Sequence, residues 1–447
     1  MLNARGIMKS MLNTDCQVLL EKLPRRLLPS LEAGRRVGQI VRGFKTPPAA
    51  IVSLGKASVA MLAAAYEALG TDGDAVPALC IRPAGIDPGV HALAGKPVTI
   101  VAAGHPLPDE GSFRAGDRLL GMIDRLERGT RLLAMISGGA SALADKPVER
   151  LSETVNHEVF QRLVGSGLPI GDLNTVRRHL SEIKGGNLLR RCIERGVEVD
   201  LITVSDVPGD RPQDIGSGPF SPDPTRFADA LEIARQIDGF PKEALGVLHT
   251  GADGMLPETL KPSQVPAGAC RCRCILSARQ AVDAVIKMLE DAGEQAIALP
   301  FPLAGNRHQW VGRFEEEIRM GRLQENLWTA ACGELEVPMP AGARAGRGGR
   351  ASSLVLDLAN IALLLGRAID VAVLATDGAD GNSGAGGGFL TAEELGQCSR
   401  EEIEAALTRF DAAGWLGARG RLYPGAATGT NLGDILLLRL RSLEPCP

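Results

Sequence analysis

Short apolar runs alternate with longer segments of helical periodicity along most of this chain. The runs are mostly β-branched or aliphatic, and each precedes a turn that contains Gly or Asp. They occupy residues 50–54, 98–102, 131–136, 200–204, 274–276, 295–299 and 370–375. The helical segments include residues 58–69, 112–126, 278–292 and 352–367. This alternation predicts an α/β protein built from βαβ units, with largely parallel sheets that carry helices on both faces.

Chain length and local composition predict two domains. A chain of 447 residues with 45% apolar and 23% charged positions can bury more than one core. A stretch rich in Gly, Pro and polar residues, 239–266, separates the first group of strands from the second. We therefore expect an N-terminal domain over residues 1–240 and a C-terminal α/β domain over residues 241–447.

Charge and hydropathy argue against two classes of partner. A net charge of -4 and an aromatic content of 3% disfavour nucleic acid, which requires basic grooves and stacking platforms. The most apolar stretch, 354–374, contains Asp357, Arg367 and Asp370, so it predicts a helix and a strand rather than a membrane span. The first residues lack the apolar core of a signal peptide, and we expect a cytoplasmic protein. A homo-oligomer is compatible with the sequence.

Three cysteines alternate in Cys270-Arg-Cys-Arg-Cys274, a pattern that places their side chains on one face of a strand. Thiolates so arranged could bind a soft metal ion. No His or further Cys pair lies nearby in the sequence, and buried thiols are common, so we favour the structural interpretation.

A loop typical of phosphate-binding turns follows the run at 131–136. It contains Ser137, Gly138, Gly139 and Ser141, but no lysine, and no segment fits the G-x-x-x-x-G-K-[ST] pattern. Glycines allow a ligand to approach the backbone, and both serine hydroxyls can donate to an anion. A tight turn with a serine N-cap explains the same residues equally well. If the loop holds a phosphate, its cation must come from elsewhere.

Lys56 is the first candidate for that cation, because it follows the run at 50–54 and precedes a helical segment. A lysine at a helix start opposes the helix dipole unless an anion binds there, which favours a functional role over a merely exposed side chain.

A second basic segment, 174–187, contains Arg177, Arg178, Lys184 and two consecutive glycines. Cations beside glycines suggest a second anion site. A helix that ends near Lys184 with solvated charges is the simpler interpretation, and spacing alone slightly favours it.

Acidic and amide side chains follow other predicted strands. Asp206 and Asp210 come just after the run at 200–204, where they could hold Mg²⁺ or accept the proton of an attacking hydroxyl. They could equally belong to a plain turn. Later loops add further polar side chains, namely Asp377, Asp380, Thr430, Asn431, Arg347 and Arg350.

Nine segments resemble one family in their residues and in their order. They are LGKAS, AGHPLPDEGS, ISGGASAL, LNTVRRHLSEIKGGNL, SDVPGD, IGSGPFSPDP, GRGGR, TDGADG and ATGTN. Between about residues 50 and 440 the chain is similar to the class II glycerate kinases, the glycerate 2-kinase family with a C-terminal MOFRL domain, here about residues 330–440. The resemblance implies phosphorylation of D-glycerate, usually to 2-phosphoglycerate, with ATP and Mg²⁺. It also implies a cleft between a Rossmann-like domain and the MOFRL domain.

The resemblance assigns roles by position. Lys56 and Arg350 take the places of the two charges most often proposed for the family's site, and Asp206 or Asp210 handles the metal ion or a proton. The remaining predicted substrate or phosphate contacts are Ser137, Gly138, Gly139, Ser141, Arg178, Lys184, Asp210, Asp377, Thr430 and Asn431. Lys56 would thus supply the cation that the loop at 137–141 lacks.

The sequence departs from the family at the residues after Arg350, where Ala351-Ser352-Ser353 replaces the usual Asn-Gln-Glu. We expect such changes to affect substrate choice, so a four-carbon aldonate kinase and a catalytically silent metabolite-binding protein stay open as alternatives. Family members have often been labelled hydroxypyruvate reductases. That activity is disfavoured because no G-x-G-x-x-G follows a predicted strand.

Overall fold

The structure is a computed structural model that describes residues 16–85, 89–207, 209–337, 346–426 and 428–442. Contacts divide the chain into two compact units. Ala33–Ser277 forms one, the parallel-sheet unit, and the residues up to Glu32 together with those from Ala278 onward form the other, the mixed-sheet unit. Parts of the N-terminal stretch, of the Gly-rich stretch 341–349 and of the SDVPGD and ATGTN motifs lie outside the described residues.

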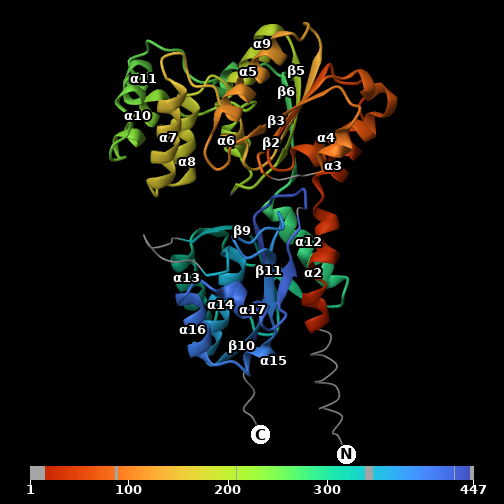
Figure 1. Ribbon diagram of the computed structural model, residues 1–447, viewed down its shortest axis with the longest axis vertical. Coiled ribbons are helices and arrows are strands. Elements are labelled where there is room, and N and C mark those ends of the chain that lie inside the picture. Colours follow the sequence, from red (N-terminus) through yellow and green to blue (C-terminus); the bar gives the residue numbers. More distant parts are fainter. Residues whose placement is uncertain (1–15, 86–88, 208, 338–345, 427, 443–447) are drawn as a thin grey trace, which may run out of the picture. The chain divides into compact units, whose positions relative to one another are not determined.

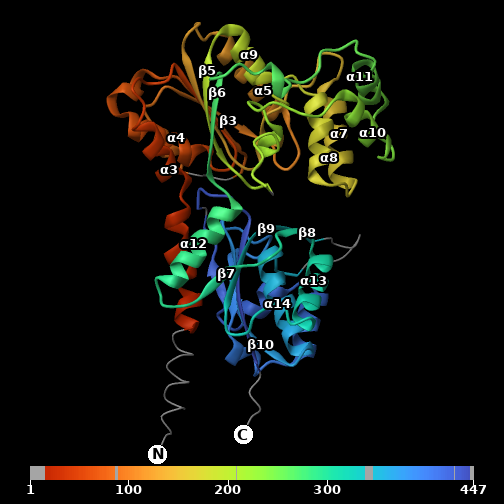
Figure 2. The same ribbon diagram turned by 180° about the vertical axis from the view of Figure 1, so that it is seen from behind.

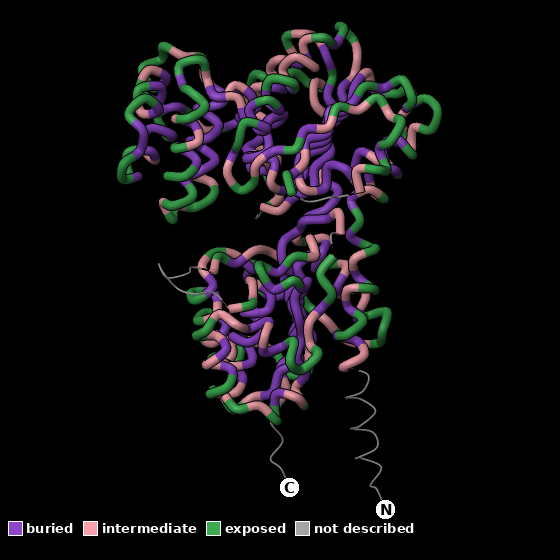
Figure 3. The backbone as a smooth tube through the Cα atoms, in the orientation of Figure 1, coloured by how far each residue is buried: buried purple, intermediate pink, exposed green. Residues whose placement is uncertain are grey.

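The parallel-sheet unit is built on six strands in the order β3-β2-β1-β4-β5-β6, and all neighbours are parallel. The strands are β1 (Ala50–Leu54), β2 (Ala78–Pro83), β3 (Val98–Ala103), β4 (Arg131–Ile136), β5 (Glu198–Val204) and β6 (Cys270–Leu276). The central strands β1 and β4 are almost wholly buried, as expected of apolar strands covered on both faces. Buried backbone, drawn in purple in Figure 3, runs through the interior of the unit. The predicted Rossmann-like sheet is confirmed.

Helices cover both faces of this sheet. The helices α3 (Ala33–Val41) and α4 (Ser58–Leu69) pack together on one face, and α5 (Glu110–Asp124) and α9 (Asn187–Arg195) pack together on the other (Figure 1). A short helix, α6 (Ala140–Leu143), directly follows the loop after β4.

Four further helices form a group beside the sheet, drawn in yellow to green in Figure 1. They are α7 (Glu153–Gly165), α8 (Ile170–His179), α10 (Phe227–Arg235) and α11 (Lys242–Ala252). They share an apolar core of their own that includes Leu163, Val176, Phe227 and Leu248. The helix α8 carries the first part of the basic segment and packs on α10 within this group.

The mixed-sheet unit has the strand order β12-β11-β10-β13-β9-β7, with β8 paired to β9. Its strands are β7 (Ala296–Ala298), β8 (Leu303–Asn306), β9 (Trp328–Glu336), β10 (Arg367–Ala375), β11 (Ala385–Leu390), β12 (Leu422–Pro424) and β13 (Asp434–Ser442). Among the described strands of this unit, only β7 and β8 run parallel to their neighbour, β9, so the expectation of a largely parallel sheet is wrong here. The loop between β10 and β11 is too short for a helical crossover, which parallel neighbours require.

Helices surround the mixed sheet as well. They are α2 (Leu23–Leu27), α12 (Ala278–Glu290), α13 (Arg307–Arg319), α14 (Arg350–Leu364), α15 (Ala392–Leu395), α16 (Arg400–Thr408) and α17 (Ala412–Gly417). The helix α14 packs on β10 and β11, and α12 lies beside β7 and β9 (Figure 2). No described helix of either unit is long and apolar enough to cross a membrane.

The two units divide the chain differently from a single boundary near residue 240. That position lies inside the parallel-sheet unit, because α11 packs on α10 and β6 pairs with β5. The N-terminal residues contact the mixed-sheet unit instead. The hydroxyl of Tyr423 donates to the carbonyl of Leu20 at 2.8 Å, and that of Thr430 donates to the carbonyl of Leu31 at 2.8 Å.

Candidate active site

The strand order of the parallel sheet reverses between β1 and β4. Chain connections leave these two neighbouring strands toward opposite sides, and open α/β sheets bind their ligands at such a point, beyond the carboxyl ends of the strands. The residues that follow β1 are Gly55 and Lys56, and those that follow β4 are Ser137, Gly138 and Gly139. The predicted glycine loop and its predicted cation therefore begin at adjacent strand ends.

Hydrogen bonds join the two loops directly. The backbone N–H of Lys56 donates to the carbonyl of Gly138 at 2.9 Å, and the N–H of Ser137 donates to the carbonyl of Leu54 at 2.9 Å. The Ser137 hydroxyl accepts from the N–H of Ala57 at 3.0 Å. A Cβ at Gly55 would lie 2.2 Å from the Ser137 Oγ, and Gly55 has a φ of 124°, so this approach needs glycine.

The Lys56 side chain runs along the glycine loop. Its Cγ lies 3.4 Å from the position that a Cβ on Gly139 would occupy, and the ring of His105 lies 3.0 Å from the same point. Lys56 is half-buried and His105 is exposed. The structure thus brings a cation from the β1 loop to the glycine loop after β4, while its catalytic role stays a prediction.

The hydroxyl of Ser141 belongs to a polar chain that leads away from the loop. It lies 2.7 Å from the hydroxyl of Ser217, which in turn donates to the Asn174 side-chain oxygen at 3.0 Å. Arg177 donates to the same oxygen at 3.4 Å.

Arg178 and Lys184 are buried and already have carboxylate partners. Arg178 binds Asp223 at 3.0 Å and also binds Asp214, and its side chain is 3% exposed. Lys184 is fully buried, with its Nζ 2.6 Å from Asp145. Burial lowers the pKa of Lys184, against the opposing effect of Asp145. The helix with solvated charges is therefore wrong, and contact of either residue with a substrate stays a prediction.

Asp206 and Asp210 lie in the loop after β5, and both are half-buried. Asp210 has a φ of 52°, and its N–H donates to the carbonyl of Val207 at 3.3 Å. No group of three His, Cys, Asp or Glu side chains suited to a metal ion occurs in the described part of the chain. Mg²⁺ in kinases is often held by one or two carboxylates together with phosphates and water, so binding of this ion by Asp206 and Asp210 stays a prediction.

The other predicted cation, Arg350, begins α14 in the mixed-sheet unit. Both terminal nitrogens of its guanidinium donate to Glu334, at 2.9 and 3.2 Å, and its Nε lies 3.2 Å from Asp434. Strand pairing brings Glu334 and Asp434 close to each other, because Asp434 on β13 pairs with Gly333 on β9. The acidic surroundings, Asp434 first and then Glu334, raise the pKa of Arg350 although burial, the largest influence, lowers it.

Asp434 is 3% exposed, and its carboxyl is unusually easy to protonate. Burial raises the pKa of Asp434 to about 7, although the Arg350 guanidinium lowers it. Glu334, Asp380 and Asp377 add to the increase. Near neutral pH, the charge next to Arg350 therefore changes with the protonation of one buried carboxyl.

The loop after β10 organises the start of α14. Asp380 accepts hydrogen bonds from the N–H groups of Ala351 and Ser352, at 2.8 and 3.0 Å. A Cβ on Gly349 would lie 2.1 Å from the Asp380 Oδ1, so the GRGGR segment needs glycine at this place. The residues that depart from the family thus serve as a capped helix start.

The other predicted residues of this unit have mixed surroundings. Asp377 is half-buried and accepts from the N–H of Ala379 at 3.0 Å. The Thr430 hydroxyl is committed to the carbonyl of Leu31. Asn431 is 2% exposed, and its Oδ1 has no hydrogen-bond partner among the described residues. Ligand contacts by these three side chains stay predictions.

Two family models match the chain. One, described as a domain of unknown function (DUF4147), matches residues 18–248, and the MOFRL family model matches residues 327–434. A protein of Agrobacterium vitis, provisionally named hydroxypyruvate reductase, is 34% identical over 86% of this chain and 85% of its own length.

This chain belongs to the class II glycerate kinase family. A relative from Thermotoga maritima named D-glycerate 2-kinase is 29% identical over 87% of this chain and 89% of its own length. A crystal structure of glycerate kinase from Thermotoga maritima matches with a TM-score of 0.77 at 25% identity, covering 95% of this chain and 99% of the other.

The family's sequence motifs did not reveal several polar side chains of both units. They are His105, Asn174, Ser217, Glu334 and Asp434. His105, Asn174 and Ser217 occur inside the recognised motifs, and this position was the only signal that could have indicated them. Glu334 and Asp434 required the strand pairing of β9 and β13 to bring them to Arg350.

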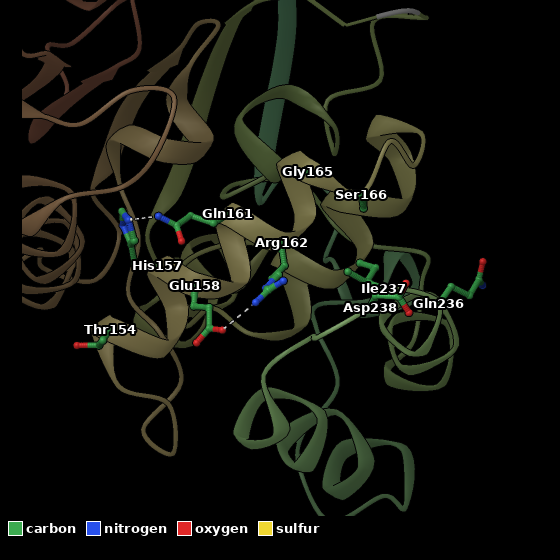
Figure 4. Close-up of a pocket in the computed structure, with 10 residues that line it drawn as sticks. All are labelled: Thr154, His157, Glu158, Gln161, Arg162, Gly165, Ser166, Gln236, Ile237 and Asp238. Carbon is green, nitrogen blue, oxygen red and sulfur yellow. Dashed lines mark hydrogen bonds and ion pairs between the residues drawn. The ribbon is translucent and has the colours of Figure 1, made fainter. Parts of the chain in front are cut away.

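A cavity of about 740 Å³ opens on the helical group rather than at the glycine loop (Figure 4). Its lining includes His157, Glu158 and Gln161 of α7 and Asp238 beyond α10. Glu158 pairs with Arg162 across its wall at 3.8 Å. None of its lining residues is a predicted site residue.

Proposed function

We propose that this protein transfers the terminal phosphoryl group of ATP to D-glycerate, with 2-phosphoglycerate as the product and Mg²⁺ as the required ion. The observation that carries the proposal is the joining of Lys56 to the glycine loop at the switch point of the parallel sheet. Phosphoryl transfer depends mainly on positioning and on neutralisation of charge, and a lysine over a glycine loop supplies both. The names of the relatives support glycerate as the acceptor.

Each side chain then has a distinct part. Lys56 neutralises phosphoryl oxygens, and the glycines beside it leave room for them to approach the backbone. Asp206 and Asp210 would hold Mg²⁺, which neutralises phosphate charge when it is bound. Arg350 is the second cation of the proposal, and Glu334 fixes its guanidinium through two hydrogen bonds.

A reductase is the second candidate, because relatives carry that name and the strand order equals that of dinucleotide-binding folds. The loop after β1 argues against it. It contains Leu54-Gly-Lys-Ala-Ser58 instead of the G-x-G-x-x-G turn that lets a pyrophosphate contact the helix start.

The deciding experiment measures ADP release from Mg·ATP with D-glycerate, beside oxidation of NADH and NADPH with hydroxypyruvate. We expect ADP release that requires glycerate, with no reductase activity, and NMR of the product to place the phosphate on C2. A four-carbon aldonate tested in parallel would replace glycerate as the substrate if it is turned over with the higher kcat/KM. Reductase turnover without ADP release would refute the proposal.

A further inference from the structure

Four polar side chains form a chain of hydrogen bonds beside the glycine loop. Ser141 comes from α6, Ser217 from the 3₁₀ turn η4 (Ile215–Ser217), and Asn174 and Arg177 from α8. Their order is Ser141, Ser217, Asn174 and Arg177, with separations of 2.7, 3.0 and 3.4 Å. Only Ser141 belongs to the glycine loop itself, so the direction of the hydrogen bonds decides what Ser141 can offer a ligand.

Arg177 fixes one end of the chain. Its side chain is 9% exposed, and it has no carboxylate partner among the described residues, unlike Arg178 and Lys184. Its guanidinium stacks on Phe160 with a separation of 4.8 Å. Burial is the first cause that lowers the pKa of Arg177, to about 10, so it stays protonated at neutral pH. Arginine has only donors, and the Asn174 atom that faces it must therefore be the acceptor.

The other side of Asn174 requires the same orientation. Its Nδ2 donates to the carbonyl of Asp214 at 3.4 Å. If the amide were turned over, its NH₂ group would face the Arg177 donor and its oxygen would face the Asp214 carbonyl. One contact would then join two hydrogen-bond donors and the other two acceptors, which is unfavourable for buried groups.

The direction of the remaining bonds follows from proton counting. Ser217 has one hydroxyl proton, and it must donate this proton to the Asn174 oxygen because that oxygen has none. The 2.7 Å contact between the two hydroxyls must then use the proton of Ser141. Half-buried Ser141 is left with lone pairs only, and acts toward a ligand as an acceptor.

Ser217 is held firmly in this place. It has a φ of 61°, a conformation that a residue other than glycine rarely adopts. Its neighbour Gly216 approaches α6 so closely that a Cβ there would lie 2.7 Å from the Ala140 Cβ. Strained backbone of this kind persists where the surrounding structure over-determines it.

We propose that Ser141 accepts a hydrogen bond from a hydroxyl group of the hydroxy-acid substrate, and that Arg177 sets this polarity through Asn174 and Ser217. This inference rests on the proposed kinase function, and it gives the Ser141 hydroxyl the opposite polarity to the donor toward an anion that the sequence suggested. Ionised phosphate oxygens only accept hydrogen bonds, whereas the hydroxyl of a hydroxy acid can donate. Ser141 would contact the substrate, and the other three are positioning residues.

The test uses two monofluoro analogues of D-glycerate, each with fluorine in place of one hydroxyl group, because fluorine cannot donate. Their dissociation constants and that of D-glycerate are measured by calorimetry on the whole protein. For the wild type we expect one analogue to bind about tenfold or more weakly than D-glycerate, the effect of one lost hydrogen bond. In Ser141→Ala the difference in affinity between D-glycerate and this analogue should disappear, because D-glycerate itself binds more weakly. In Ser217→Ala the same difference in affinity should become smaller. Ser141 no longer donates its proton to Ser217 there and can donate it to the analogue, which then binds more tightly.

Ser166→Ala is the matched control, since its hydroxyl donates to the carbonyl of Leu163 and accepts from the N–H of Leu168, both near the end of α7. This variant should keep the wild-type difference in affinity between D-glycerate and the weaker-binding analogue. Equal binding of both analogues and D-glycerate to the wild type would overturn the inference, as would equal weakening of all ligands in Ser141→Ala. The proposed function has a separate readout, because it fails only if the wild type shows no turnover of D-glycerate with Mg·ATP.

Discussion

At the scale of single residues, burial decides which charges are available to a ligand. Lys184 and Lys56 both occur beside glycines in recognised motifs, and both are predicted site residues. Lys184 is fully buried against Asp145, which also accepts from Ser181 at 2.6 Å and Asn156 at 2.9 Å. Lys56 instead lies half-buried along the glycine loop. We therefore expect a substitution of Lys184 to affect the stability of the fold first.

Lys184→Met should lower the free energy of unfolding by about 3–5 kcal/mol, because it leaves the Asp145 carboxylate buried without its cation. The measurement is urea denaturation followed by circular dichroism. Lys146→Met is the control, since its ion pair with Asp117 is 2.7 Å long but partly exposed, and should cost at most about 1 kcal/mol. Equal effects of the two variants would contradict the role given to Lys184.

Asp434 predicts a pH dependence of the mixed-sheet unit. The pKa of its carboxyl is raised from 3.8 to about 7 by burial above all, so between these pH values the unfolded chain releases a proton that the folded chain keeps. The free energy of unfolding should therefore fall as the pH rises from about 4 to about 7, by an amount on the order of 4 kcal/mol, and this contribution should be constant above pH 7.

Tryptophan fluorescence can measure the unfolding of the mixed-sheet unit at each pH, because Trp310, Trp328 and Trp415 all belong to that unit. Asp434→Asn should remove the downward slope while other carboxyls still titrate. If the free energy of unfolding depended on pH in the same way in the wild type and in Asp434→Asn, a raised pKa at Asp434 would be excluded.

At the scale of elements, the sequence predicts best where one signal dominates. The bounds of β1, β4 and α4 agree with the predicted runs and helical segment, because apolar content and periodicity define them. The strand β11 was missed, since Ala-Gly-Gly-Gly-Phe-Leu has the composition of a loop and becomes a strand only between β10 and β12. The polar chain at Ser141 was also unpredictable, because Ser141 and Ser217 lie 76 positions apart.

The start of α14 offers a test of packing at this scale. Gly349→Ala should destabilise the mixed-sheet unit by about 1–3 kcal/mol, because its Cβ would lie 2.1 Å from Asp380 and displace the cap. Gly348→Ala should cost less, since its nearest neighbour would be the Phe410 carbonyl at 3.3 Å. Tryptophan fluorescence during urea denaturation measures both, and a reversed order would contradict the assigned cap.

At the scale of the whole molecule, the N-terminal residues belong with the C-terminal half of the chain. Leu23, Leu27 and Leu31 are buried, and α2 contacts α12 in the mixed-sheet unit. Neither composition nor spacing predicts this, because the contacts join segments about 400 positions apart, such as Leu20 and Tyr423.

A chain that begins at Ala33 should lose protection in the mixed-sheet unit. We expect faster hydrogen exchange in α12 and at Tyr423, whose partners the truncation removes, and unchanged exchange in β1 and β4. Hydrogen exchange with mass spectrometry measures this by segment. Faster exchange in β1 and β4 alone would assign the N-terminal residues to the other unit.

The central claim is that Lys56 supplies the cation of the glycine loop for phosphoryl transfer. Its most direct test is the steady-state kinetics of Lys56→Met with Mg·ATP and D-glycerate, beside Lys287→Met, which removes a surface lysine paired with Asp291 at 3.0 Å. We predict that Lys56→Met lowers kcat/KM at least about a thousandfold with an unchanged unfolding midpoint, as expected for a group that neutralises transferred charge, while Lys287→Met keeps wild-type kinetics. Near-wild-type turnover by Lys56→Met would contradict the account.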